Sequence, residues 1–188
     1  AICLSEEIEV KETTLFNIPV WTKEIPNFHQ TMKRDLISLL NEHKEERVDG
    51  QKFSTNKRTK GNDFVQRFFN IMNTEIKELY ASVYNNWSDC KQLTITDAWS
   101  VSYHKGDYQR MHNHSSTGLS GILYVDVPVN APYLDILQPW NSWIQDKTEM
   151  TSVKFREGGI VVFPSFVQHA TQPNESDKVK RVIAFDMK

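Results

Sequence analysis

The sequence lacks the features that would place it among secreted, membrane or nucleic-acid-binding proteins. It has only two cysteines, Cys3 and Cys90, which are too few for a disulfide framework, so we expect a reducing compartment. The net charge is −2, which gives no general attraction to nucleic acid or to an anionic membrane. No apolar run approaches membrane-spanning length, and the first residues lack the basic and apolar regions of a signal peptide. We therefore expect a cytoplasmic protein without nucleic-acid or membrane partners.

The sequence also lacks several common catalytic motifs, and nothing in it indicates more than one domain. The sequence contains no serine nucleophile with a recognisable base, no phosphate-binding loop and no thiolate site. It also has no internal repeat and no low-complexity linker. A chain of 188 residues is long enough for one well-packed domain and marginal for two. We therefore expect one domain over residues 1–188, with a supporting part at 1–90 and a strand-rich part at about 91–188.

Hydrophobic periodicity predicts two helices in the N-terminal part. Residues 1–26 alternate and contain prolines, which favours one or two edge strands. Two stripes of three- and four-residue spacing follow, separated by a polar loop at about 45–61. The first stripe consists of Phe28, Met32, Leu36, Leu39, Leu40 and His43. The second consists of Phe64, Phe68, Met72, Ile76, Leu79, Val83 and Trp87. Stripes of this kind are usually buried core, so we interpret both helices as structural.

After Asn85-Asn86 the pattern becomes that of strands. Period-two alternation or a short apolar run predicts strands at 93–103, 119–127, 160–163 and 181–187. Two helices followed by many short strands indicate an antiparallel sandwich or barrel with the helices packed on one face.

Three histidines are candidates for one metal site. His112 and His114 are one residue apart, so an extended segment would point both to the same side. His169 follows an apolar strand and would complete the set. Neutral imidazole suits iron, zinc, copper and nickel. A His-x-His pair alone is weak evidence, and we interpret the remaining histidines, among them His104, as ordinary surface or core residues.

The surrounding residues resemble a known family. The run Tyr-x-x-Gly-Asp-Tyr-x-x-x-His-x-His at 103–114 is similar to the stretch with the first metal ligands of 2-oxoglutarate and Fe(II)-dependent oxygenases of the prolyl-hydroxylase type. Residues 120–128 resemble the strand that follows. Residues 158–165 with His169 resemble a subgroup of small oxygenases found in bacteria and phages. The resemblance covers about residues 95–187 and implies a double-stranded β-helix (jelly-roll) core.

The resemblance also implies a metal, a co-substrate and a reaction. Family members hold Fe(II) with His-x-Asp/Glu and a distal histidine, so the ligands expected here are His112, His114 and His169. His114 stands where the carboxylate is expected, and the nearest spare carboxylate, Asp107, is predicted in a turn. The implied activity is that of a dioxygenase that consumes dioxygen and 2-oxoglutarate, releases succinate and CO₂, and hydroxylates a small-molecule or protein substrate.

The carboxylate of 2-oxoglutarate needs a cation, which relatives supply on the strand after the distal histidine. Arg181 lies at the family's usual distance from His169, and a guanidinium binds a carboxylate bidentately. Lys180 points to the opposite face, and an alignment on Phe185 favours it instead. By resemblance, Tyr124 shares the carboxylate with this cation and Tyr103 is a further pocket tyrosine. Our first choice is Arg181, with Lys180 as the alternative.

Two other functions would also explain a cluster of His112, His114 and His169. A cupin-like dioxygenase uses three histidines and no 2-oxoglutarate, and a basic residue in its pocket would then serve the substrate. A metal-binding or structural jelly-roll domain without catalysis would also place them together. Trp99, Trp140 and Trp143 are expected to pack, with an aromatic lid formed by the last two as the alternative. A homodimer is compatible with the sequence.

Overall fold

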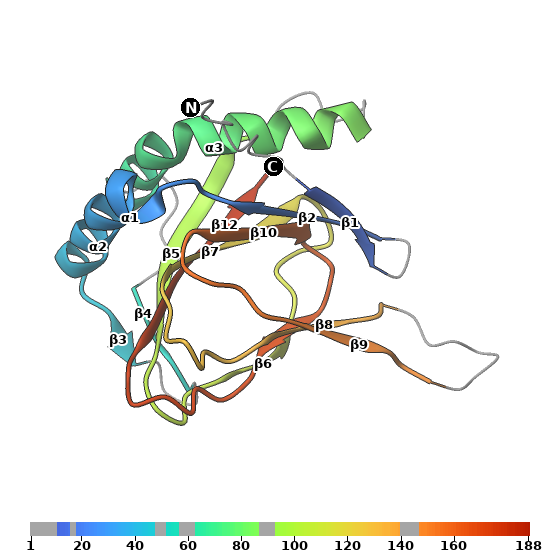
Figure 1. Ribbon diagram of the computed structural model, residues 1–188. Coiled ribbons are helices and arrows are strands. Elements are labelled where there is room, and N and C mark those ends of the chain that lie inside the picture. The colour runs from blue at the N-terminus through green and yellow to red at the C-terminus, as the bar shows by residue number, and fades with distance from the viewer. Residues whose placement is uncertain (1–10, 16–17, 48–51, 57–62, 87–92, 140–146) are drawn as a thin grey trace, which may run out of the picture.

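Two antiparallel sheets form the body of the protein in the computed structural model (Figure 1), which describes residues 11–15, 18–47, 52–56, 63–86, 93–139 and 147–188. The larger sheet has the strand order β1-β2-β10-β7-β12-β5-β4-β3. Its strands are β1 (Lys11–Leu15), β2 (Ile18–Glu24), β3 (Glu46–Arg47), β4 (Ser54–Thr55), β5 (Ile95–Tyr103), β7 (Leu119–Asp126), β10 (Gly159–Pro164) and β12 (Lys180–Met187). The smaller sheet has the order β6-β11-β8-β9. Its strands are β6 (Gln109–His112), β8 (Leu134–Leu137), β9 (Met150–Val153) and β11 (His169–Thr171).

Helices cover the face of the larger sheet that points away from the smaller one (Figure 1). They are α1 (Phe28–Thr31), α2 (Lys33–Glu42) and α3 (Asp63–Asn86). The first predicted helix is divided at Met32, whose φ of −122° departs from helical geometry. The prediction of two structural helices is otherwise confirmed, because their apolar stripes are buried against the sheet. Trp87, the last residue of the second stripe, lies outside the described residues.

Strand alternation in the larger sheet produces two separate apolar cores. In β12, Ile183 and Phe185 pack toward the helices, whereas Val182 faces the smaller sheet. In β7, Leu123 belongs to the helix-side core and Tyr124 to the core between the sheets. Alternate residues of a strand point to opposite faces, so each central strand contributes to both cores. The core between the sheets is where the candidate site residues gather.

The predicted long strands are confirmed, and the short ones were missed. The four strands expected at 93–103, 119–127, 160–163 and 181–187 are β5, β7, β10 and β12. The N-terminal strands were expected at an edge. β1 does lie there, but β2 pairs with both β1 and β10. Strands of two to four residues such as β6 and β11 escaped detection, because alternation needs more residues to be recognised.

Some predictions concern residues that the structure does not describe. Cys3, Cys90, Trp140 and Trp143 lie outside the described residues, so the expected reduced thiols and the packing or lid role of these tryptophans stay predictions. Among the described residues, no helix has the length and apolar character needed to cross a membrane.

Candidate metal centre

A pocket between the two sheets collects most of the predicted site residues. Strands β5, β7 and β12 of the larger sheet line one side, and β6 and β11 of the smaller sheet line the other. The three candidate histidines, both candidate tyrosines and Lys180 lie in its wall. The cavity encloses about 380 Å³ of empty space, including its opening to solvent.

The turn after β5 carries the chain from the larger sheet to the strand with the first histidine. Gly106 has a φ of +81°, a conformation that glycine adopts without strain. The buried Asp107 carboxylate accepts hydrogen bonds from the backbone N–H of His104 at 2.9 Å and from the guanidinium of Arg47 at 2.6 and 2.9 Å. Asp107 thus lies in the predicted turn, and its oxygens are occupied there, away from the histidines.

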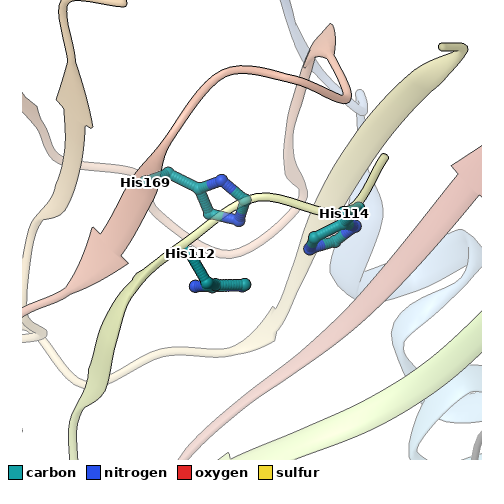
Figure 2. Close-up of side chains that lie close together, drawn as sticks. All are labelled: His112, His114 and His169. Atoms are coloured by element: carbon teal, nitrogen blue, oxygen red, sulfur yellow. The ribbon is translucent and has the colours of Figure 1, made fainter. Parts of the chain in front are cut away.

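Strand pairing brings the histidines together (Figure 2). His112 on β6 is the register partner of His169 on β11, and their ring centroids are 4.3 Å apart. His114 lies just after β6, where its backbone N–H donates to the carbonyl of Ser165 at 3.0 Å. One ring nitrogen from each of the three lies within 4.8 Å of the others. The predicted cluster is therefore present, in a geometry that a single ion could bridge.

In His112 and His169, Nδ1 forms a hydrogen bond with the backbone, and Nε2 is the candidate metal-binding atom. Nδ1 of His112 lies 2.8 Å from the carbonyl oxygen of Arg110, and Nδ1 of His169 lies 3.1 Å from that of Val167. A carbonyl only accepts, so each Nδ1 carries the proton and donates it. In these tautomers Nε2 is unprotonated, which is the form that a metal ligand needs. Outer hydrogen bonds of this kind orient metal-bound imidazoles.

Burial keeps at least two of the imidazoles neutral. Desolvation is the main cause that lowers the pKa of His169 to about 3, and the neighbouring His112 and His114 add to it. Desolvation likewise lowers the pKa of His112. Neutral imidazole is the form that binds metal, so these ligands need not lose a proton at physiological pH.

His114 has a carboxylate behind it. Its Nδ1 lies 2.6 Å from Oδ1 of Asp186 on β12 and 3.0 Å from Oγ of Ser120 on β7. The Ser120 hydroxyl also lies 2.8 Å from the same Asp186 oxygen and 2.9 Å from Oγ of Ser165. Asp186, Ser120 and Ser165 are all buried. The sequence prediction missed Asp186, whose only signal was its position on the same face of β12 as Val182.

Gln109 and Tyr103 connect the histidines to the rest of the pocket. The side-chain amide of Gln109 lies 2.9 Å from Nε2 of His112, and its oxygen accepts a hydrogen bond from the Tyr103 hydroxyl at 2.7 Å. Metal binding at Nε2 of His112 therefore requires the Gln109 amide to turn away. Burial raises the pKa of Tyr103 and of Tyr124, so both phenols keep their protons and remain donors. Sequence reasoning overlooked Gln109.

Lys180, not Arg181, points into the pocket. Lys180 is the register partner of Tyr103 across β12 and β5, and its side chain is buried. Its Nζ lies 5.3 Å from the ring centroid of Tyr103 and 5.1 Å from that of Tyr124, and 3.5 Å from the carbonyl oxygen of Pro132. Among the described residues, no carboxylate forms an ion pair with Lys180. Burial lowers the pKa of Lys180 to about 7.

The structure does not bring Arg181 to the site. Its side chain lies on the helix-facing side of β12, where Nη1 donates to the side-chain oxygen of Asn41 at 2.9 Å. Adjacent strand residues point to opposite faces, so only one of the two cations enters the pocket. Arg181, the first choice from the sequence, therefore does not line the pocket, whereas Lys180, the alternative, does. Which of the two binds 2-oxoglutarate stays a prediction.

The other candidates fall where the sequence suggested. Tyr124, a pocket residue by resemblance, lines the pocket, and Ile122 on the same face of β7 lines it too. Trp99 lines it too, with its ring centroid 5.3 Å from that of His114, so its packing is against a candidate ligand. Of the three set-aside histidines, His29 and His104 are exposed, whereas the ring of His43 packs on Phe64 at 5.0 Å.

Comparison with known proteins agrees with this geometry. Residues 97–186 match the family model described as "Putative 2OG-Fe(II) oxygenase". No curated protein matches the sequence.

Solved structures share the fold at low identity. A Pseudomonas putida prolyl-4-hydroxylase superposes with a TM-score of 0.65 at 11% identity, covering 91% of this chain and 92% of that one. HygX from Streptomyces hygroscopicus, solved with nickel and 2-oxoglutarate bound, gives 0.64 at 10% identity over 89% and 82%. A 2OG-Fe(II) oxygenase family oxidoreductase from Burkholderia pseudomallei gives 0.65 at 10% over 89% and 84%. These likenesses confirm the predicted jelly-roll fold. Over residues 97–186, the strand-rich part of the chain is similar in sequence to the 2OG-Fe(II) oxygenases.

Proposed function

We propose that the protein is an Fe(II)- and 2-oxoglutarate-dependent dioxygenase that oxidises, by hydroxylation, a substrate still to be identified. One observation carries the proposal. A cluster of three imidazoles and a buried ammonium group, Lys180, line the same small pocket. An oxygenase of this class needs both, because it binds a metal and a dicarboxylate side by side.

The donor set fits a divalent transition metal. His112, His114 and His169 would hold the ion through Nε2, since hydrogen bonds occupy Nδ1 of each ring. Imidazole is a good ligand for iron, and three protein ligands leave coordination positions open toward the pocket. When bound, the iron supplies the dioxygen chemistry that couples decarboxylation of 2-oxoglutarate to oxidation of the substrate.

Lys180 is our candidate for the residue that binds the distal carboxylate of 2-oxoglutarate. Two tyrosines flank it, and HygX binds 2-oxoglutarate on the same fold. A buried cation with no carboxylate of its own gains most from an incoming anion, because the anion offsets its desolvation. The phenols of Tyr103 and Tyr124 would donate further hydrogen bonds. Apolar neighbours such as Val101 and Val182 exclude water and strengthen these interactions.

Within the described part of the chain, the histidine cluster contains no carboxylate, which favours one rival function. A cupin-like dioxygenase would use the same three histidines without 2-oxoglutarate, and Lys180 would then bind the substrate. The two functions differ in whether 2-oxoglutarate binds and is consumed.

The decisive experiment measures the co-substrate directly. We expect the protein loaded anaerobically with Fe(II) to develop a visible charge-transfer band on addition of 2-oxoglutarate. Admission of air should then release succinate slowly even without the substrate, as followed by proton NMR. Tight Fe(II) binding with neither the band nor succinate would contradict the proposal and favour the cupin-like enzyme. Failure to bind any divalent metal would favour a structural jelly-roll domain.

The binding of 2-oxoglutarate is expected to depend on pH through Lys180. In the free protein its pKa is lowered to about 7 by burial, so at pH 8 the amine is mostly neutral. A bound carboxylate favours the ammonium form and raises this pKa, so binding takes up a proton. Affinity should therefore be highest below pH 7 and fall above it, by at most about tenfold per pH unit.

Proton uptake can be measured by calorimetry at pH 8 in two buffers of different ionisation enthalpy. The groups around Nζ are the Tyr103 and Tyr124 rings and the Pro132 carbonyl. Both phenols stay protonated over this range, because burial raises their pKa, so the uptake reports Lys180. An affinity that is flat between pH 6.5 and 8.5 would mean that Lys180 does not meet the ligand's charge.

A further inference from the structure

His114 differs from the other two candidate ligands in what its Nδ1 contacts. His112 and His169 donate to neutral backbone carbonyls, whereas His114 contacts the side-chain carboxylate of Asp186 at 2.6 Å. Both side chains of this pair are almost fully buried, with 6% and 7% of their surface exposed. A buried carboxylate is costly unless it is paired, so its position against one particular ligand requires an explanation.

The hydrogen bonds around Asp186 define the tautomer of His114. A metal can bind Nε2 only if the proton of the neutral ring resides on Nδ1. Nδ1–H then donates to Oδ1 of Asp186, and the Ser120 hydroxyl donates to the same oxygen at 2.8 Å. Ser165 completes the chain, because its hydroxyl lies 2.9 Å from that of Ser120. All of these contacts are consistent with an ionised carboxylate that accepts from both neighbours.

Asp186 acts on the site through His114 and not as a ligand itself. The group whose ligand atoms converge contains the three histidines and does not include Asp186. Strand pairing holds the carboxylate in place, since Asp186 is the register partner of Ser120 on β7 and of Asp97 on β5. Asp97 is also buried, so two acidic residues lie opposite each other on β12 and β5.

We propose that Asp186 is a positioning residue that supplies, through His114, the negative charge which the three-histidine set lacks. A carboxylate that accepts the Nδ1 proton makes the imidazole a stronger donor and fixes its ring, and loss of such a partner costs 10–100-fold in metal affinity in general. The charge that relatives place directly on the metal is here one residue further out. The inference rests on the metal-binding half of the proposed function and is independent of 2-oxoglutarate.

The first test removes the negative charge of Asp186 while keeping the shape of the side chain. Asp186→Asn retains an oxygen that accepts from His114 and Ser120 but removes the negative charge. We expect Co(II) and Fe(II) to bind about 10–100-fold more weakly, measured by titration with Co(II) visible absorption and by anaerobic competition with a chelator. Asp135→Asn is the matched control. Asp135 is also buried and accepts hydrogen bonds, from Ser152 and Gln172, but it contacts none of the histidines. Its metal affinity should stay within about twofold of the wild type.

A double-mutant cycle separates this role from a general loss of packing. His114→Asp places a carboxylate at the ligand position itself, where the charge of Asp186 is no longer needed. Asp186→Asn should then weaken metal binding strongly in the wild-type background and by less than about threefold in the His114→Asp background. Equal losses in both backgrounds would show that Asp186 serves only the fold, and the inference would be wrong.

A measurement on the unmodified protein covers the case in which Asp186→Asn does not fold. In the Co(II) protein, protons on ligand imidazoles have strongly shifted NMR signals. We expect three exchangeable Nδ1–H signals, of which the one from His114 exchanges slowest with solvent because it is buried against Asp186. Only two such signals would mean that His114 does not bind through Nε2, and the inference would fail. A loss of 2-oxoglutarate turnover in the presence of all three signals would instead contradict the proposed function alone.

Discussion

Replacing His169 with alanine is expected to abolish stable metal binding while leaving the protein folded. His169 lies opposite His112 in the β6–β11 pair, so its removal takes away the candidate ligand on β11. Tight protein metal sites are worth about 10–16 kcal/mol over four ligands, so one ligand corresponds to roughly two to three orders of magnitude in affinity. Calorimetric titration with Co(II), and with Fe(II) under anaerobic conditions, measures this loss. His112→Ala should behave in the same way.

His104→Ala is the matched control for this prediction. The His104 side chain is exposed in the turn before β6, and its hydrogen bonds with Asp107 use its backbone N–H and carbonyl, both of which alanine keeps. This variant should bind metal as the wild type does. Thermal unfolding in the presence of a chelator distinguishes a lost ligand from a lost fold. Unchanged affinity in His169→Ala, with a normal unfolding transition, would remove His169 from the site.

The sequence indicated the histidine cluster through local patterns, although the β6–β11 pairing that brings the rings together is not local. A His-x-His pair in an extended segment must point to one side, and His169 follows an apolar run that reads clearly as a strand. The long strands and the helical stripes are predictable for the same reason, since each contains enough residues to show its period. Short strands of the smaller sheet, such as β8 and β9, have four residues each and depend on their neighbours in space.

The sequence favoured Arg181 for the pocket, whereas the structure places Lys180 there. Alternation says that the two point to opposite faces, but not which face lines the pocket. The neighbouring residues on each face of β12 show which face lines the pocket. Arg181 shares its face with Ile183 and Phe185, which belong to the helix-side core, whereas Lys180 shares its face with Val182. The distance from His169, which suggested Arg181, is a weaker guide than the register of the strand.

Asp186 could not be predicted because its role exists only in three dimensions. It lies 72 residues from His114 in sequence and meets it through the pairing of β12 with β7. A carboxylate near the end of an apolar strand has many ordinary explanations. The missing carboxylate at His114 was visible in the sequence, but the compensating one was not.

Replacing Lys180 with methionine is expected to weaken 2-oxoglutarate binding and to stabilise the protein at the same time. A charge-assisted hydrogen bond is worth about 1.5–3 kcal/mol, so affinity for 2-oxoglutarate should fall about 10–100-fold. Metal affinity should stay within about twofold, because Lys180 is not a ligand. Anaerobic titration of the Fe(II) protein with 2-oxoglutarate measures the first effect. Arg181→Met is the control, and it should leave both affinities unchanged because Arg181 contacts Asn41 on the other face.

The stability effect follows from the direction of the pKa change. Burial lowers the pKa of Lys180 to about 7, whereas the unfolded chain keeps the ordinary value near 10.5. Between these values the unfolded state binds more protons, so the stability of the wild type without ligand rises with pH over this window. Methionine has no such proton and fills a similar volume. The gain in melting temperature should therefore be largest near pH 7, about 2–8 °C, and shrink toward pH 10.

These opposite effects distinguish a binding residue from a structural one. Replacing a residue that serves the fold makes the protein less stable. A residue that serves a ligand instead destabilises the ligand-free protein, and this cost is offset when the ligand binds. Addition of 2-oxoglutarate and Fe(II) should accordingly raise the melting temperature of the wild type above that of Lys180→Met. If Arg181→Met loses 2-oxoglutarate binding and Lys180→Met does not, the cation that meets the co-substrate is Arg181, and β12 must shift its register when the ligand binds.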